Sequence, residues 1–218
     1  MSSPGTFHTA VLHTRDIPVA AQFYNAVFGW TIDGDRFMLR GECAAATHDE
    51  RDTARWVPYF AAEGVERGTL AVHRDPEGAV FGTCAPDDPR VVTLETGPGS
   101  IWWTEVLSND YAALKDFYRG VFQWTFVETA KFAPHLLYIT CMNGEKQAGG
   151  ILPTGPHWNV DARWQVLFAV EHLETSIADV VAGGGSVEFG PNEVPAAGRF
   201  AVVRDPQGAL FALAQPNT

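Results

Sequence analysis

The pattern of apolar and polar positions divides the chain into short strands and amphipathic helices. Residues 101–107 (IWWTEVL) form a β-rich run that ends at the polar turn Ser108-Asn109-Asp110, which predicts a strand. The residues that follow, YAALKDFYRGVF, place apolar side chains at helical spacing, which predicts a helix over 110–122 with one apolar face. The same alternation from strand to helix occurs around Asp16.

Three sequence blocks occur twice, in the same order. They are FYNAVFGWTI and FYRGVFQWTF, RWVPYFAAEGVE and RWQVLFAVEHLE, and RDPEGAVFGTC and RDPQGALFALA. The first pair begins at Phe23 and Phe117, an offset of 94 positions (117 − 23). Three matched blocks in one order indicate an internal duplication.

The third block predicts a hairpin turn in each half of the chain. In Asp75-Pro76-Glu77-Gly78 and Asp205-Pro206-Gln207-Gly208, proline presets φ and glycine accepts a left-handed conformation. Gly183-Gly184-Gly185 is expected to end a helix. The second half is thereby predicted to hold two βαβββ units, with strands near 101–107, 124–129, 135–142, 147–152, 164–170, 186–189, 198–204 and 209–214, and helices at 110–122 and 174–184.

The first half is shorter than the second. Glu171 to Arg204 spans 33 positions, whereas Glu63 to Arg74 spans 11, a difference of 22 (33 − 11). The second unit of the first half is therefore expected to lack a helix and a strand, which would leave apolar surface around Phe60 unless another element covers it. The same expectation holds for Phe81.

These residues carry a family resemblance. The helix motif FYxxVFxW, the glycine-rich helix end and GRFAVVRDPQGALFAL resemble the vicinal-oxygen-chelate (glyoxalase/bleomycin resistance protein/dioxygenase) superfamily over nearly the whole chain. TLETGPGSIWWTEVLSND and GPHWNVDARWQVLFAVEHLE are similar to the two-domain hydroxylase-like proteins of actinomycetes. Some of those sit beside aromatic-polyketide or anthracycline biosynthesis, and others are described as antibiotic-resistance or secreted-antigen homologues.

The resemblance implies an α+β fold in which tandem βαβββ units are paired into curved sheets. It implies two glyoxalase-like domains, of which the N-terminal one is shortened. The expected boundaries are an N-terminal domain at 1–86, a linker rich in proline and glycine at 87–99, and a C-terminal domain at 100–218.

Metal-using members of the superfamily place His or Glu on the first strand of each unit and Glu on the last, so that a divalent ion can take two vicinal substrate oxygens. A transition metal needs three or four His, carboxylate or thiolate donors. By the resemblance, this chain therefore has no such metal site and no cofactor, although a rearranged site using His13 with Glu105 or His157 stays open. The corresponding positions here are Thr9, Val57, Gly82, Trp103, Gln165 and Ala212.

Two side chains of the first strand after the linker carry the strongest functional hypotheses, and each has a structural alternative. Trp103 either stacks on a planar aromatic ligand or fills the core. Glu105 is either a general base or an anchor for a ligand amine, or it is a strand-edge residue in solvent or paired with an Arg. The candidate ligand-binding residues are Trp103, Glu105, Leu107, His157, Trp158, Trp164, Gln165 and His13.

The other aromatic and histidine residues are assigned to the scaffold. Trp30 and Trp124 occupy matched repeat positions just past a helix, which favours a place in the core. His48, His135 and His172 are expected at the surface. No Ser or Cys nucleophile motif, P-loop or dinucleotide fingerprint is present in the sequence, so no catalytic residue is assigned.

Composition limits the cellular compartments and the partners that we expect for this protein. The formal net charge is −11 and no Lys/Arg cluster occurs, which argues against nucleic-acid binding. No apolar run approaches the roughly 20 residues that cross a bilayer, and MSSPGTFHTA does not resemble a signal peptide. Three cysteines, odd in number and far apart, are expected to be buried thiols in a reducing compartment. A cytoplasmic location follows.

The leading hypothesis for function is metal-independent binding of a small, flat, largely apolar molecule, such as an antibiotic or aromatic polyketide. The protein would act in sequestration and resistance, or as an accessory to an oxidative tailoring step. One alternative is a superfamily enzyme (a lyase, isomerase or dioxygenase) with an atypical site. Another is a degenerate structural partner that supports a homodimer. The sequence leaves open whether the protein is an enzyme.

Overall fold

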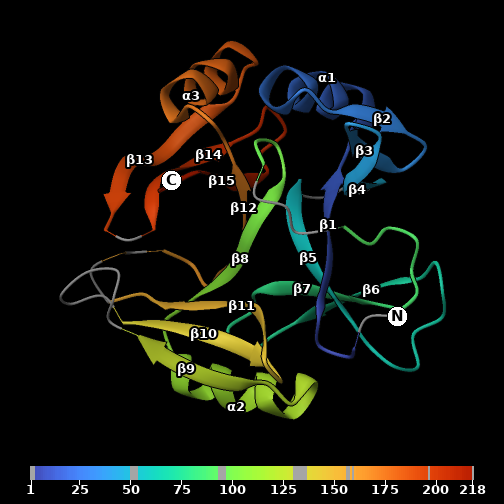
Figure 1. The fold of residues 1–218 in the computed structure, drawn as a ribbon, viewed down its shortest axis with the longest axis vertical. Coiled ribbons are helices and arrows are strands. Elements are labelled where there is room, and N and C mark those ends of the chain that lie inside the picture. The colour runs from blue at the N-terminus through green and yellow to red at the C-terminus, as the bar shows by residue number, and fades with distance from the viewer. Residues whose placement is uncertain are drawn as a thin grey trace. The chain divides into compact units, whose positions relative to one another are not determined.

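The two halves of the chain form two mixed sheets (Figure 1). The computed structural model describes residues 3–49, 54–92, 97–129, 137–155, 158, 160–195 and 197–217. The first half forms β1 (Phe7–Thr14), α1 (Ile17–Phe28), β2 (Thr31–Asp33), β3 (Arg36–Leu39), β4 (Glu42–Asp49), β5 (Arg55–Ala61), β6 (Leu70–Arg74) and β7 (Val80–Cys84). The second half forms β8 (Ile101–Ser108), α2 (Tyr111–Phe122), β9 (Thr125–Thr129), β10 (Tyr138–Asn143), β11 (Lys146–Pro153), β12 (Arg163–Ala169), α3 (Leu173–Ala182), β13 (Ser186–Val194), β14 (Gly198–Arg204) and β15 (Leu210–Pro216).

The strand order confirms the repeated units. The seven-stranded sheet runs β2-β3-β4-β1-β5-β7-β6, and the eight-stranded sheet runs β13-β14-β15-β12-β8-β11-β10-β9. In every unit the last strand lies parallel to the first, as in the pairs β1–β4, β5–β7, β8–β11 and β12–β15. The α+β fold of tandem βαβββ units is therefore confirmed.

The helices begin and end where the sequence predicts. The carboxylate of Asp16 accepts a hydrogen bond from Val19 N at 3.0 Å, and Asp110 caps α2 in the same way. α1 ends at Gly29, whose φ is 71°, and α3 ends at Gly183. β13 is longer than predicted, because register shifts along its pairing with β14 interrupt the regular alternation of side chains.

The second unit of the first half lacks a helix, as predicted. A loop at 62–69 joins β5 directly to β6, and residues 54–92 contain no helix. Phe60 and Phe81 are nevertheless buried, at 0% and 2% exposure, because aromatic rings of α2 cover them. The ring centroid of Phe122 lies 5.3 Å from that of Phe60, and that of Tyr118 lies 5.5 Å from that of Phe81. The element that covers these two residues is therefore α2, and they expose no apolar surface.

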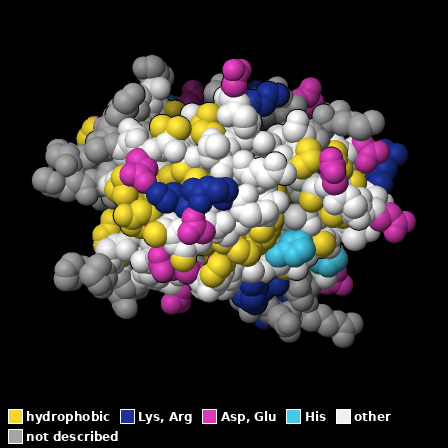
Figure 2. All heavy atoms as spheres, turned by 90° about the horizontal axis from the view of Figure 1, so that it is seen from below, with side chains coloured by type: hydrophobic (Ala, Val, Ile, Leu, Met, Phe, Trp, Pro, Cys, Tyr) yellow, Lys and Arg dark blue, Asp and Glu magenta, His cyan; other side chains and the backbone are white. Residues whose placement is uncertain are grey.

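Apolar side chains are exposed elsewhere on the same elements. Val72 on β6 is 45% exposed and Val121 on α2 is 46% exposed. The face of the molecule seen in Figure 2, viewed from the side on which α2 lies in Figure 1, shows hydrophobic side chains lying among charged groups.

The chain divides into two compact units, and each unit combines residues from both halves. Unit 1 comprises Met1–Thr9, Val57–Val91 and Thr104–Gln165, and unit 2 comprises Ala10–Trp56, Val92–Trp103 and Val166–Thr218. In unit 2, α1 and α3 lie side by side (Figure 1). Unit 1 has α2 in the described residues and no second helix beside it. The sequence boundaries at 86 and 100 stay a prediction.

A buried hydrogen-bond chain joins the two halves within unit 1. The indole N–H of Trp164 donates to Tyr118 Oη at 2.7 Å, and Tyr118 Oη donates to Asp75 Oδ2 at 3.0 Å. The other carboxylate oxygen of Asp75 accepts from Glu77 N and Ala79 N, as the predicted turn requires. The aspartate therefore closes its own hairpin and also holds α2 of the other half.

Unit 2 repeats this arrangement. Trp56 donates to Tyr24 Oη at 2.9 Å, and Tyr24 donates to Asp205 Oδ2 at 3.0 Å. Asp205 Oδ1 accepts from Gln207 N and Ala209 N. The repeated sequence blocks thus form the same hydrogen-bond chain in both units.

The remaining scaffold assignments are mostly confirmed. Trp30 and Trp124 are buried, and each indole N–H donates to a glycine carbonyl at 2.9 Å, on Gly99 and Gly5 respectively. The three cysteines are free thiols. Cys84 and Cys141 are buried as expected, but Cys43 is partly exposed, because it lies near the start of β4, where neighbouring residues reach solvent.

Candidate functional site

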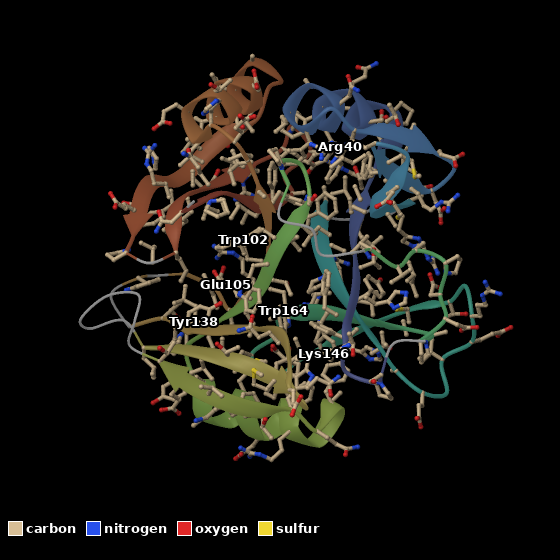
Figure 3. All side chains as sticks on the ribbon, in the orientation of Figure 1. Arg40, Trp102, Glu105, Tyr138, Lys146 and Trp164 are labelled. Carbon is tan, nitrogen blue, oxygen red and sulfur yellow. The ribbon has the colours of Figure 1, made fainter. Side chains whose placement is uncertain are left out.

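A buried carboxylate and a phenol meet in unit 1. Glu105, on β8, is 8% exposed, and Tyr138, on β10, is 9% exposed. Tyr138 Oη donates a hydrogen bond to Glu105 Oε2 at 2.8 Å (Figure 3). Burial raises the pKa of Glu105, while the hydrogen bond from Tyr138 and the positive charge of Arg163 oppose that rise.

A glycine makes this contact possible. Gly150, on β11, is the strand partner of Glu105. A Cβ atom at Gly150 would lie 2.0 Å from Tyr138 Oη, so only glycine lets the tyrosine cross β11 and reach the carboxylate. The Gly149-Gly150 pair therefore has a structural reason to lack side chains.

β12 contributes two polar side chains beside β8. Thr104 Oγ1 donates to the carbonyl of Gln165 at 3.2 Å, which ties the two strands together. Side chains alternate along a strand, so Arg163 and Gln165 share one face of β12 and Trp164 lies on the other. A Cβ atom at Gly149 would lie 3.4 Å from Thr104 Cγ2 and 3.5 Å from the ring of Trp164, so Thr104 and Trp164 share one face of the sheet. Glu105 and Gln165 therefore lie together on the opposite face. We call Glu105, Tyr138, Arg163 and Gln165 the Glu105 cluster.

The Glu105 cluster contains a polar group that the protein leaves unsatisfied. Gln165 is 4% exposed, and its Oε1 has no hydrogen-bond partner among the described residues. A buried amide without a partner costs about 1–3 kcal/mol of stability. The assignment of oxygen and nitrogen in such an amide follows from its partners, so this side chain can offer either an acceptor or a donor to a bound molecule.

The other candidate ligand-binding residues of unit 1 differ in how much of each side chain is exposed to solvent. Trp164 is 5% exposed, and its indole N–H is taken by Tyr118, on the side of β12 that faces α2. Leu107 is 5% exposed and pairs with Leu152 on β11. Trp158 is 47% exposed, and its backbone N–H donates to Gly155 O. His157 lies outside the described residues.

Two candidates belong to unit 2. Trp103 is partly buried and packs, together with Trp102, against a small cluster of Leu167, Ala212 and Ala214. His13 is 2% exposed, and its ring centroid lies 5.1 Å from that of His48, its partner on β4. The structure therefore brings Glu105 and Gln165 together and distributes Trp103 and His13 to the other unit.

The residues at the superfamily's metal-ligand positions do not fit a metal. Ala212 is a buried strand partner of Leu167. A Cβ atom at Gly82 would lie 2.2 Å from a ring carbon of Tyr59, so no longer side chain fits there. Across the residues that the structure describes, no group of three or more His, Cys, Asp or Glu could hold a metal ion. His48 and His172 are exposed as expected, and His135 lies outside the described residues.

The fold is that of a protein built from tandem βαβββ units, and its residues at the metal-ligand positions do not fit a metal. The chain belongs to the glyoxalase/bleomycin resistance protein/dioxygenase superfamily, which matches residues 100–213. It is 28% identical to a Mycobacterium tuberculosis protein named "Putative glyoxylase CFP32", with 97% of this chain and 95% of that protein covered. It is 26% identical to the anthracycline biosynthesis protein DauV of Streptomyces sp. strain C5, with 98% and 94% covered.

Solved structures share the fold at low sequence identity. The 2,3-dioxygenase LapB from Pseudomonas sp. KL28 is 13% identical, with a TM-score of 0.62, over 100% of this chain and 94% of that chain. This likeness shows two glyoxalase-like domains and does not extend to activity. No helix among the described residues is long and apolar enough to cross a membrane.

Two members of the Glu105 cluster, Tyr138 and Arg163, were not predicted from the sequence. Tyr138 lies on a different strand, and the signal that points to it is the pair of glycines at 149–150, since a strand glycine often marks close approach of another group. Arg163 belongs to a repeated block and looks like part of the scaffold. Pairing of Glu105 with an arginine is one alternative that the sequence leaves open. In the structure, the positive charge of Arg163 favours the ionised form of Glu105.

Proposed function

We propose that this protein binds a small, flat, largely apolar molecule without a metal, and that the Glu105 cluster fixes the orientation of that molecule. The observation that carries the proposal is the buried amide of Gln165, whose Oε1 lacks a partner on the same face of the sheet as Glu105. A scaffold gains nothing from such a group. A ligand with complementary polar groups would satisfy it.

The relatives support the choice of ligand class. DauV and DnrV, the latter from Streptomyces peucetius, are named anthracycline biosynthesis proteins, and both match nearly the whole chain. Anthracyclines are planar aromatic polyketides that carry hydroxyl and carbonyl groups. We infer an antibiotic or aromatic polyketide as the ligand, bound for sequestration or as an accessory to oxidative tailoring.

The first test is a titration of the purified protein with a planar hydroxyanthraquinone, followed by tryptophan-fluorescence quenching and calorimetry. Saturable 1:1 binding that survives dialysis against EDTA supports the proposal. Absence of binding to hydroxyanthraquinones and anthracyclines overturns it.

Gln165→Met separates a binding role from a scaffold role. Because the amide is buried without a partner, the substitution should raise the free energy of unfolding by about 1 kcal/mol while it weakens binding severalfold. Urea unfolding and the same titration measure the two effects. If stability falls and binding is unchanged, Gln165 belongs to the scaffold and the proposed site is wrong.

The enzyme hypothesis makes a different prediction. A metal-dependent lyase, isomerase or dioxygenase would lose turnover in EDTA and regain it with one added metal. Cytoplasmic location, the homodimer, the stacking role of Trp103 and the contributions of His13, Leu107, His157, Trp158 and Trp164 stay predictions, and light scattering tests the dimer directly.

A further inference from the structure

The hydrogen-bonding groups of the Glu105 cluster define which ligand group they accept. Glu105 is a carboxylate, so when ionised it can only accept hydrogen bonds. Tyr138 already donates to Oε2 at 2.8 Å, which directs a ligand to Oε1. A ligand group placed there must therefore bring its own donor.

The charge near Glu105 narrows the choice further. The guanidinium of Arg163 already acts on the carboxylate from β12, so a cationic ligand would gain less from Glu105 than it would from an isolated carboxylate. An anionic ligand group would face the lone pairs of Glu105 directly. A neutral donor avoids both costs.

Resting on the proposed function, we infer that the Glu105 cluster selects planar aromatic molecules that carry a free phenolic hydroxyl and rejects their O-methyl ethers. The hydroxyl donates to Glu105 Oε1. The amide of Gln165 serves a second polar group of the ligand and can act there as donor or acceptor. A methyl ether has no proton to donate to Glu105 Oε1, and it places a methyl group against a buried charge.

This selectivity implies a place in a reaction sequence. A protein that binds the free phenol and rejects its methyl ether would bind the product of a hydroxylation, or the substrate of an O-methylation. The reaction that supplies its ligand is then one that creates or unmasks an aromatic hydroxyl.

The experiment compares 2-hydroxyanthraquinone with 2-methoxyanthraquinone, at a pH at which the ligand hydroxyl is protonated and Glu105 is ionised. The parent protein should bind the hydroxyl compound at least about tenfold more tightly, the lower limit expected for a lost hydrogen bond to a charged acceptor. Glu105→Gln should reduce that ratio severalfold. Glu128→Gln, on exposed strand β9, is the matched control and should leave the ratio unchanged.

The outcomes separate this inference from the proposed function. Equal affinity for the two compounds in the parent overturns the selectivity and leaves the binding function in place. Binding of neither compound overturns the proposed function and the inference with it. An unchanged ratio in Glu105→Gln, with native near-ultraviolet circular dichroism, removes Glu105 from the recognition of the hydroxyl. Tyr138→Phe provides a second variant, which should keep the preference because Glu105 still accepts the ligand hydroxyl.

Discussion

At the residue scale, the geometry of the Glu105 cluster depends on one missing side chain. Tyr138 can reach Glu105 only because position 150 has no Cβ atom. The hydrogen bond between Tyr138 and Glu105 joins two buried groups, where the low local dielectric strengthens it. Within the cluster, the side-chain oxygen of Gln165 is buried without a hydrogen-bond partner among the described residues.

Gly150→Ala should disrupt this arrangement. The added Cβ would lie 2.0 Å from Tyr138 Oη, so the tyrosine must move, at a cost of about 1–3 kcal/mol typical of overpacking. Gly120→Ala is the control, since no atom lies within 4 Å of a Cβ there, and it should be neutral or stabilise α2 by up to about 1 kcal/mol. Thermal unfolding of both variants checks this, and equal effects would contradict it.

The pKa of Glu105 predicts a pH dependence with a definite sign. Burial raises this pKa above the ordinary value of 4.5, so the folded protein binds the proton more tightly than the unfolded chain. The parent should therefore lose stability as pH rises from about 4.5 through the raised pKa, and Glu105→Gln should lack that loss. In urea unfolding, the free energy of unfolding of Glu105→Gln should rise relative to that of the parent as pH increases. A stability difference that is constant from about pH 4 to pH 8 would contradict the prediction, and Glu128→Gln provides the baseline.

At the element scale, each Asp-Pro-x-Gly turn attaches a hairpin to a helix from the other half of the chain. Asp75 accepts from Tyr118 of α2, and Asp205 accepts from Tyr24 of α1. The residue after each proline adds a second contact: the carboxylate of Glu77 accepts from Asn109 N, and the side chain of Gln207 accepts from Asp16 N. These contacts hold each hairpin turn against the first residues of the helix.

Tyr118→Phe should cost about 1–3 kcal/mol of stability, because it leaves the buried Trp164 N–H and one oxygen of Asp75 without their partner. Tyr111→Phe removes the same hydroxyl from an exposed position on the same helix and should cost less than about 0.5 kcal/mol. Chemical denaturation of both variants measures the difference. Similar values for the two would show that the hydrogen-bond chain contributes no stability.

At the scale of the whole molecule, the compact units do not follow the order of the sequence. Unit 1 needs β6 and β7 from the first half to pack with α2 from the second, and unit 2 needs α1 from the first half to pack with α3 from the second. Each compact unit therefore combines a repeat unit from the first half with one from the second.

A fragment of residues 100–218 should consequently fail to unfold cooperatively by itself, since it lacks Asp75 and the strands that complete unit 1. A mixture with a fragment of residues 1–92 should restore a single cooperative transition. Circular dichroism during urea unfolding measures both. A monomeric 100–218 fragment with a sharp transition would show that the second half is an independent domain.

The sequence by itself determined the repeated elements. Hydrophobic periodicity, the capping aspartates and the Asp-Pro-x-Gly turns depend on neighbours within a few residues, so the helices at 110–122 and 174–184, the shortened unit and the family could be predicted. The mismatch at the metal-ligand positions was also readable, because it depends on residue type alone. These features could be predicted because each depends only on residues that are close together in the sequence.

The tertiary structure decided which elements pack together and which polar groups meet. Tyr138 and Glu105 are 33 positions apart, and Tyr118 and Asp75 are 43 positions apart, so no local pattern connects them. The cover of Phe60 and Phe81 by α2 depends on the exchange of blocks between halves. Contacts of this kind depend on the pairing of sheets and helices in space, and only the folded chain specifies that pairing.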